Sequence, residues 1–308
     1  MMDVIKVLLR AGLVVGAIMS VAGLLALVFP PADFPNHFRP LTLAGCFTLL
    51  IVAALLRQRS IAFASAALIA FNGPLVALPL ATSAKPFIAA PRQKILKVIA
   101  FNIWTHNSRL HDIAQWLEAE DADIVVLQEI SARSHGVLRS ALAKRYPHIH
   151  DCGCNELLVA SKRPWIEAGG IRRTDDRPSL NWLRFDDGNG GSWRFVGLRT
   201  VYPMRPMQQA RHYRWLEREV ASTPEPQVLA GDFNLTPWAF QLQRLMWRTG
   251  LRRHGTWARS WNAKGSLSPR MLLIDNVLST PDIRSVSFTT GPNLGSDHLP
   301  IVATVALP

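Results

Sequence analysis

The stretch VLAGDFNLTP, residues 228–237, decides the fold class of this chain. Its apolar run ends in Gly231, which permits a tight backbone path, and Asp232 and Asn234 follow at positions i and i+2. Side chains two residues apart in an extended segment point to the same side, and Pro237 favours the start of a helix. An Asx turn before that helix would explain Asn234 but does not require Asp232. A buried strand, a polar turn and a helix in this order indicate an open α/β sheet whose strand ends present a site.

Other apolar runs also carry polar residues at one end. These residues are Asn102 in 98–104, Gln128 and Glu129 after 124–127, Asp275 in 272–278, and Asp297 with His298 before 299–306. A carboxylate beside buried residues needs a partner or a cation, and Glu is a hard oxygen ligand that suits Mg²⁺ or Mn²⁺. A carboxylate can also orient an imidazole and keep it protonated, as we expect for Asp297 and His298. The plain structural alternatives are a strand-end cap for Asn102 and a solvated carboxylate for Glu129.

Strand and helix patterns alternate around these positions. We expect strands over 95–103, 124–127, 193–198, 227–230, 272–278 and 299–306, and helices over 109–120, 207–220 and 238–249. The turn Asp187-Gly188-Asn189-Gly190-Gly191 predicts a hairpin over 184–198. We therefore predict mixed sheets rather than purely parallel ones, within one domain over 95–308.

The first third of the chain is apolar enough to lie in a membrane. A hydrocarbon core of about 30 Å needs about 20 helical residues. We predict three spans, over 7–29, 41–56 and 61–81, of which the second is short and either strained or re-entrant. Residues 82–94 are rich in Ala, Pro and Ser and are typical of a linker. We therefore divide the chain into a transmembrane region (1–81), this linker and the α/β domain.

The distribution of charge indicates the side of the membrane. The chain has a net charge of +12, and residues 1–94 hold eight Lys/Arg against two Asp/Glu. Positive loops stay in the cytoplasm, which places the N-terminus and the Arg57-Gln58-Arg59-Ser60 turn there. With three spans, the α/β domain is expected outside the cytoplasm, at a bacterial inner membrane. Transport is disfavoured because the spans carry almost no polar residues for a pathway.

The ordered polar residues together resemble the endonuclease/exonuclease/phosphatase superfamily. This superfamily includes DNase I-like nucleases, abasic-site endonucleases, inositol-polyphosphate phosphatases and sphingomyelinases. The motifs are Asn102, Gln128-Glu129, Gly231-Asp232-Phe233-Asn234, Ile274-Asp275 and Ser296-Asp297-His298. The likeness covers residues 95–308 and is similar to a membrane-anchored bacterial branch. It implies a four-layer α/β sandwich with two mixed β-sheets, preceded here by an N-terminal helical transmembrane region.

The resemblance also implies a role for each motif residue. Glu129 would bind a divalent metal, Mg²⁺ or Mn²⁺, with Asn102 beside it and Asp297 as a further ligand. Asp232 would position or deprotonate the attacking water, and Asn234 would hold the phosphate. Asp275 would line the metal and phosphate site, and His298, oriented by Asp297, would contact the scissile phosphate. Such groups stabilise the negative charge of an in-line attack at phosphorus.

One position departs from the family pattern. The family usually has His, sometimes Tyr, after the strand that here contains 195–198, whereas this chain has Arg199. Arg cannot act as a general acid at neutral pH, but it can bind phosphate through two hydrogen bonds and stabilise charge. Tyr202 is the alternative proton donor. Arg199 is therefore included among the candidate catalytic residues.

These observations predict a membrane-anchored, divalent-metal-dependent phosphoester hydrolase, either a phosphodiesterase or nuclease or a phosphatase. The alternative is a non-catalytic binding or scaffold module on the same fold. Nucleic acid, a phospholipid headgroup or a small phosphoester remain open as substrates, with the bilayer as a partner and no obligate protein partner. Basic and aromatic residues over 172–184 and 252–261 suit nucleic acid, anionic lipid or solvent alike. Cys152 and Cys154 are expected to be free thiols.

Overall fold

The computed structural model describes residues 2–91, 93–151, 153, 156–255, 257–263 and 272–308. Cys152 and Cys154 lie outside this part of the chain. The chain forms two compact units, of which one comprises Met1–Thr82 with Leu235–Arg244 and the other Ser83–Asn234 with Leu245–Pro308. We call the first the membrane unit and the second the catalytic unit, after the predictions made from sequence for residues 1–81 and 95–308. The chain therefore leaves the catalytic unit at Asn234 and enters the membrane unit at Leu235, without an intervening linker.

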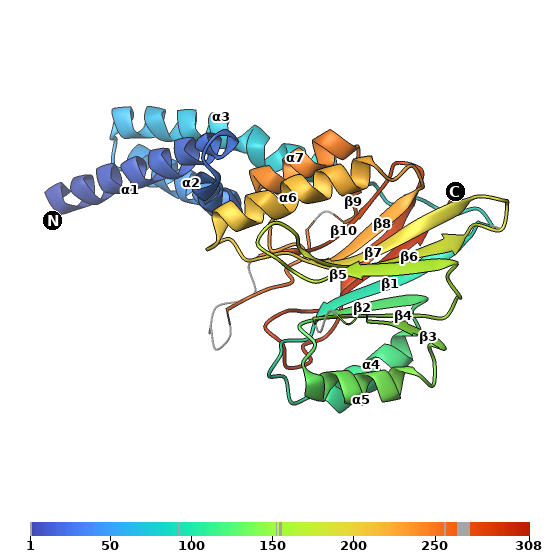
Figure 1. Cartoon of the computed structure of the whole chain (residues 1–308). Coiled ribbons are helices and arrows are strands. Elements are labelled where there is room, and N and C mark those ends of the chain that lie inside the picture. The colour runs from blue at the N-terminus through green and yellow to red at the C-terminus, as the bar shows by residue number, and fades with distance from the viewer. Residues whose placement is uncertain (1, 92, 152, 154–155, 256, 264–271) are drawn as a thin grey trace. The chain divides into compact units, whose positions relative to one another are not determined.

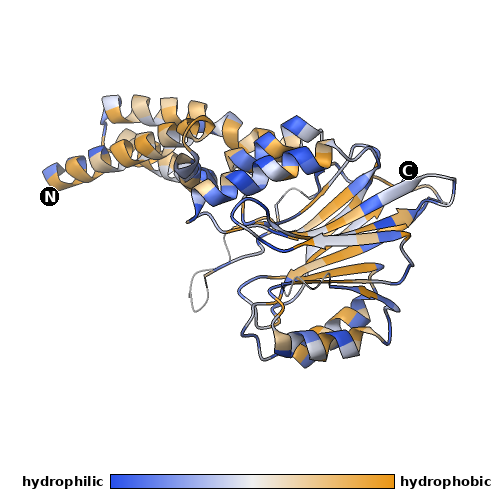
Figure 2. Cartoon of the chain, in the orientation of Figure 1, coloured by the Kyte–Doolittle hydropathy of each residue, from blue (hydrophilic) through white to orange (hydrophobic). Residues whose placement is uncertain are grey.

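The membrane unit is built from three long apolar helical segments. Its elements are α1 (Met2–Ala22), η1 (Gly23–Leu27), η2 (Pro30–Phe38), α2 (Arg39–Leu55) and α3 (Arg59–Ala81). By length and composition, Asp3–Leu27, Pro30–Leu55 and Arg59–Ala81 can each cross a membrane. The second segment is longer than the sequence predicted, because η2 runs into α2. Figure 2 shows α1–α3 mostly hydrophobic along their length.

A buried polar network lies inside this apolar unit. Asn36 donates to Asp33 (Nδ2–Oδ1 2.7 Å), and Arg39 donates to Asn36 (Nε–Oδ1 2.7 Å) and to Asn72 (Nη1–Oδ1 3.1 Å). Asn72 in turn donates to the hydroxyl of Ser20 at 2.7 Å. Polar side chains in apolar surroundings are retained when they satisfy one another. Only Ser20 and Asn72 of this network lie within the predicted spans, and the sequence did not predict the network because its members are far apart in the chain.

The network also contacts the start of the helix that follows residues 228–237. Helix α7 spans Phe240–Thr249, and the Asp33 carboxylate accepts hydrogen bonds from the backbone N–H of Phe240 (2.7 Å) and Gln241 (3.0 Å). The first N–H groups of a helix have no partner within the helix, so a carboxylate there is favourable. Trp238 adds an indole hydrogen bond to the Val76 carbonyl at 3.1 Å.

The catalytic unit contains two six-stranded sheets with the same pattern of directions. The first has the order β11-β12-β1-β2-β4-β3, and the second β5-β6-β7-β8-β10-β9. Each has a single parallel pair at its centre, β1 with β2 and β7 with β8, and antiparallel neighbours around it. The strands are β1 (Ile95–Asn102), β2 (Ile124–Gln128), β3 (His148–His150), β4 (Leu157–Ser161), β5 (Glu167–Ile171), β6 (Ser179–Asp186), β7 (Ser192–Arg199), β8 (Gln227–Asp232), β9 (Arg252–Arg253), β10 (Asp275–Ser279), β11 (Arg284–Thr290) and β12 (Ile301–Ala306).

Two hydrophobic cores hold the layers together. One fills the space between the sheets, with residues such as Val98 and Val126 from the first sheet and Phe195 and Val228 from the second. The other lies between the first sheet and the helices α4 (Leu110–Glu120) and α5 (Ala132–Leu142). Helix α6 (Pro206–Ala221) lies along the second sheet (Figure 1). The predicted arrangement of two mixed sheets with flanking helices is confirmed.

Candidate active site

Strand direction gathers the polar residues at one edge of the catalytic unit. The parallel pair β1 and β2 ends together, with Asn102 in register with Gln128. The parallel pair β7 and β8 ends with Arg199 in register with Asp232. The antiparallel strands β10 and β12 begin at the same edge, so Asp275 lies opposite Asp232 and His298 comes just before its strand. Both sheets therefore contribute side chains to one site.

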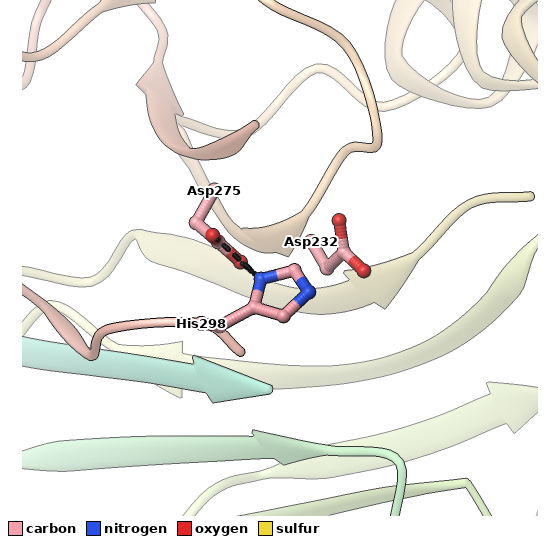
Figure 3. A group of neighbouring side chains, drawn as sticks. All are labelled: Asp232, Asp275 and His298. Atoms are coloured by element: carbon pink, nitrogen blue, oxygen red, sulfur yellow. Dashed lines mark hydrogen bonds and ion pairs between the residues drawn. The ribbon is translucent and has the colours of Figure 1, made fainter. Parts of the chain in front are cut away.

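A buried ion pair forms the centre of the site. The Nδ1 atom of His298 lies 2.8 Å from Oδ2 and 3.1 Å from Oδ1 of Asp275, and both side chains are almost fully buried. Figure 3 shows these two contacts at one ring nitrogen, while the other nitrogen points away from Asp275. Asp275 therefore orients the imidazole and leaves the second nitrogen for other partners.

The sequence assigned the orienting role to the wrong carboxylate. Asp297 accepts a hydrogen bond from the indole of Trp261 (Nε1–Oδ2 3.1 Å) and contacts the Ser296 hydroxyl at 3.3 Å. Neighbouring side chains of an extended segment point to opposite faces, so Asp297 and His298 diverge. Asp275 reaches the imidazole because its strand begins beside it.

Opposing effects set the charge of His298. Burial alone lowers the pKa of His298, but attraction and hydrogen bonding from Asp275, with smaller contributions from Asp232 and Asp297, raise this pKa to about 9. The ring is therefore an imidazolium at neutral pH. A fixed cation in a dry site can stabilise negative charge that develops on a phosphate.

Asp232 is buried beside this pair and is held by amide groups. Its carboxylate accepts hydrogen bonds from the Asn234 backbone (2.9 Å) and side chain (2.9 Å) and from Asn102 Nδ2 (3.1 Å). Burial raises the pKa of Asp232, and the cations of His298 and Arg199 only partly offset it, so that this pKa is about 6. A carboxylate of this kind can exchange a proton near neutral pH, as a general base must.

Gly231 makes this placement of Asp232 possible. Its backbone has φ of 147°, and a Cβ atom there would collide with the Leu198 carbonyl oxygen of the adjacent strand. The residue was expected to permit a tight turn; the structure gives close approach of β7 to β8 as the reason. Any side chain at this position would push the two strand ends apart.

A second ion pair lies at the rim of the site. Arg199 donates to Glu129 (Nη2–Oε1 2.7 Å), and its Nε lies 3.8 Å from Oδ2 of Asp232. Burial by itself raises the pKa of Glu129, but Arg199 and the hydrogen bond from Asn102 (2.9 Å) outweigh it, and the pKa is lowered. Arg199 therefore occupies one oxygen of the carboxylate that was expected to bind a metal.

The backbone around this pair adopts an uncommon conformation. Trp104, Glu129 and Asn234, which follow three of the strand ends, have φ of 63°, 58° and 50°. Left-handed backbone disfavours most residues with a Cβ atom and is retained where the surroundings enforce it. Here it turns the Glu129 and Asn234 side chains into the site instead of along the strand.

Sequence reasoning missed one carboxylate of the site. Glu156 contacts Arg199 (Oε2–Nη1 3.6 Å), Arg173 (Oε1–Nη2 2.7 Å) and the Ser179 hydroxyl (2.7 Å). It precedes β4, which runs antiparallel to β2, so the beginning of β4 meets the end of β2. A polar residue before an apolar run was the available signal. Tyr202, the alternative proton donor, is exposed and lies under the guanidinium of Arg205.

The donor set suits a divalent cation. Ligand atoms of Asp232, Asp275 and His298 lie within 4.8 Å of one another. The protonated ring of His298 has no lone pair for a metal, so the carboxylates are the donors of this group. Oε2 of Glu129 adds a carboxylate oxygen whose contacts to Thr105 are long, at 3.4 Å. Carboxylate oxygens are the ligands that hard cations prefer. The carboxylates of Glu129, Asp232 and Asp275 outnumber the cations of Arg199 and His298, so the cluster keeps negative charge. A divalent cation would turn this charge positive and favourable to phosphate.

The sequence between these strand ends matches a known family. Residues 99–298 fit the Endonuclease/Exonuclease/phosphatase family. This match spans both sheets and every motif described above. The chain belongs to this family. The search of curated proteins found no match to this chain.

Solved structures of the endonuclease/exonuclease/phosphatase family share the fold. A family protein from Bacteroides vulgatus has a TM-score of 0.61 at 16% identity, with 70% of this chain and 100% of that chain covered. The mannosyl-6-phosphatase Bt3783 of Bacteroides thetaiotaomicron has a TM-score of 0.56 at 15% identity, with 68% and 99% covered. TDP2 of D. rerio, complexed with a single-strand DNA product, has a TM-score of 0.58 at 14% identity, with 69% and 99% covered.

Proposed function

We propose that this chain is a membrane-anchored, divalent-metal-dependent hydrolase of phosphoester bonds. The observation that carries the proposal is the buried Asp275–His298 pair beside Asp232, whose pKa of about 6 lies close to working pH. A fixed cation and a carboxylate that exchanges protons, placed together at a sheet edge, suit attack of water on phosphorus. Members of the family to which the chain belongs hydrolyse phosphoesters.

The reaction divides between these residues as follows. Asp232 orients the attacking water and accepts its proton as the new bond from oxygen to phosphorus forms. The ester bond from phosphorus to the alcohol oxygen breaks, and that oxygen takes up a proton from solvent. The second nitrogen of His298 and the amide of Asn234 stabilise the negative charge on the phosphoryl oxygens. Arg199 adds a guanidinium that can bind phosphate through two hydrogen bonds.

Mg²⁺ or Mn²⁺ is the cofactor that we propose. Glu129 would hold it through Oε2, with Asn102 and Asp232 beside that carboxylate. A bound divalent ion supplies Lewis-acid stabilisation of charge on phosphorus. Asp297, which was also expected to be a ligand, is engaged by Trp261 and is not included in this set.

The experiment uses the full chain in detergent micelles with Mg²⁺, Mn²⁺ or EDTA. Bis(p-nitrophenyl) phosphate, p-nitrophenyl phosphate and a single-stranded oligonucleotide cover diesters, monoesters and nucleic acid. We expect turnover that EDTA abolishes and that Asp232→Asn lowers by about 10³-fold or more. Asp112→Asn, an exposed carboxylate on α4, is the matched control and should keep full activity.

The rival function is a binding or scaffold module, and one observation favours it. Arg199 neutralises Glu129 at 2.7 Å, which opposes metal binding. Under that reading no substrate would turn over in any metal, while phosphate analogues would still bind. Turnover that persists in EDTA, or that Asp232→Asn leaves intact, contradicts the hydrolase.

A further inference from the structure

Exposed apolar side chains gather in one loop beside the site. Three large apolar residues lie within eight positions after the end of β7: Tyr202 is 40% exposed, Met204 73% and Met207 51%. Tyr202 and Met204 lie in the loop that follows Arg199 of the site, and Met207 lies in the first turn of α6. Contiguous apolar groups on a protein surface mark contact with a partner or a membrane.

The loop is fixed at its base, so this exposure is not a consequence of a loose segment. The side chain of Asn234 donates to the Thr200 carbonyl (3.0 Å), and the Thr200 hydroxyl donates to the Phe233 carbonyl (2.5 Å). The buried side chain of Gln209 donates to the Val201 carbonyl at 2.9 Å. The backbone therefore presents the apolar side chains outward from a rigid support.

The same support holds the point at which the chain enters the membrane unit. The Gln209 amide also contacts the Asn234 carbonyl at 3.3 Å, and this carbonyl belongs to the peptide bond that joins Asn234 to Leu235. Leu235–Arg244 is part of the membrane unit, where Asp33 and Trp238 hold it. The loop thus lies next to the site and next to the peptide bond at which the chain passes from one unit to the other.

The composition of the loop matches a lipid interface. Met is large and adaptable, and aromatic rings with a polar tip, such as that of Tyr, are enriched at the headgroup level. Arg205 is exposed and places its guanidinium 5.5 Å from the ring of Tyr202. A positively charged side chain at the level of the lipid headgroups is attracted to the lipid phosphates. This pattern favours lipid over nucleic acid, for which flat aromatic rings in a basic groove would be expected instead of methionines.

We propose that the Tyr202–Met207 loop enters the lipid surface and that the substrate is a phosphoester carried by a lipid. The substrate class rests on the proposed hydrolase function, whereas lipid contact by the loop does not. A lipid headgroup held at the interface would meet Arg199 first, three residues before Tyr202, and then Asp232 and His298. The bond that breaks joins phosphorus to an alcohol oxygen, with water as the other reactant.

The first test measures lipid contact in the full chain reconstituted into vesicles of phosphatidylcholine and phosphatidylglycerol. Met204→Cys carries an environment-sensitive fluorophore, in a background where Cys46, Cys152 and Cys154 are replaced by Ser. Ile166→Cys is the matched control, because Ile166 is also exposed, at 57%. It precedes β5 at the end that pairs with Arg184, which is the end of the sheet opposite to the active site. We expect emission at position 204 to shift to the blue and to be quenched by spin-labelled lipid, with neither change at 166. Equal exposure to water at both positions overturns the proposal.

The second test compares substrates. Phosphatidic acid and phosphatidylglycerol in vesicles are assayed against glycerol phosphate, bis(p-nitrophenyl) phosphate and single-stranded DNA. Met204→Ser combined with Met207→Ser should lower turnover of vesicle lipid by about tenfold or more and leave the soluble esters within about twofold, whereas Ile166→Ser should change neither. Metal-dependent cleavage of soluble esters or DNA in preference to lipid overturns the lipid substrate and leaves the hydrolase standing. Absence of all hydrolysis contradicts the proposed hydrolase function. The fluorescence measurement then still tests whether the loop contacts lipid.

Discussion

Two buried histidines in the catalytic unit have opposite charge states. His254 and His298 are both almost fully buried. The partner of His254 is the Ser279 hydroxyl at 2.7 Å, and that of His298 is the Asp275 carboxylate at 2.8 Å. Desolvation lowers the pKa of His254 to about 4, whereas His298 reaches about 9. Burial alone favours the neutral form of a histidine, whereas a carboxylate in contact with the buried ring favours the protonated form.

The two arginines follow the same rule. Arg253 is fully buried and donates to the Ser83 hydroxyl at 2.6 Å, and desolvation lowers its pKa to about 10. Burial also lowers the pKa of Arg199, but Glu129, Asp232 and Glu156 outweigh it and raise the pKa overall. The Arg253–His254 region is therefore structural in character, and the sheet edge with Arg199 and His298 is suited to binding an anion.

The largest expected effect comes from replacing the carboxylate that His298 contacts by a neutral group, so that this histidine, like His254, loses its charge. Asp275→Asn removes the carboxylate but keeps the shape, so the imidazole should lose its charge and its orientation. We expect kcat to fall by about 10³-fold and the His298 pKa, followed by NMR, to drop below its ordinary value. Asp297→Asn is the comparison, because its carboxylate bonds Trp261, and its loss should stay below about tenfold. A larger loss in Asp297→Asn than in Asp275→Asn would restore the pairing predicted from sequence.

An intermediate effect should follow from removing the rim cation. Arg199→Ala removes the ion pair from Oε1 of Glu129 and leaves the Asn102 hydrogen bond in place. This change should strengthen Mn²⁺ binding by about tenfold, because a competing positive charge at 2.7 Å is lost. The same change should lower kcat/KM for phosphoesters by about 10- to 100-fold, since phosphate loses a bidentate partner. Calorimetric titration with Mn²⁺ and steady-state kinetics measure the two effects. Weaker metal binding in the variant would mean that Arg199 orients Glu129 for the ion.

The smallest effect concerns stability near His254. The folded pKa of about 4 lies below the unfolded value, so the unfolded state takes up a proton first as pH falls below about 6.5. This contribution to stability is complete above that pH and is lost toward pH 4, by at most about 1.4 kcal/mol per pH unit. His254→Gln should flatten the decline in denaturation midpoint between pH 7 and 5. The exposed His111→Gln should leave the decline unchanged; the same slope in wild type and His254→Gln would refute this assignment.

The sequence predicted the fold well where strands end at the site. Asn102, Glu129, Arg199 and Asp232 follow apolar runs, and parallel pairing brings such ends together. Some elements that were missed have weak local patterns: α5 is polar, β3 has three residues, and β5 is partly exposed. The strand β4 was missed although its residues are mostly apolar and buried. Their place is decided by tertiary packing, which outweighs local propensity.

Contacts across the site were harder to predict than its members. The Arg199–Glu129 pair joins residues 70 positions apart, and no pattern in either segment indicates the other. Asp275 was recognised as a site residue, but adjacency in sequence favoured Asp297 as the partner of His298. Glu156 was missed because the apolar run after it was not predicted as a strand; this strand, β4, pairs antiparallel with β2 and so brings its beginning to the same edge.

The Asp33 cap on α7 has a consequence for how the protein is made. Asp33 emerges from the ribosome 207 residues before Phe240, whose N–H it binds. The membrane unit is therefore incomplete until most of the catalytic unit has been synthesised. A truncated chain that starts at the linker would contain α7 without its cap and Trp238 without Val76. Stability and activity of such a fragment would report on this missing support as much as on the site.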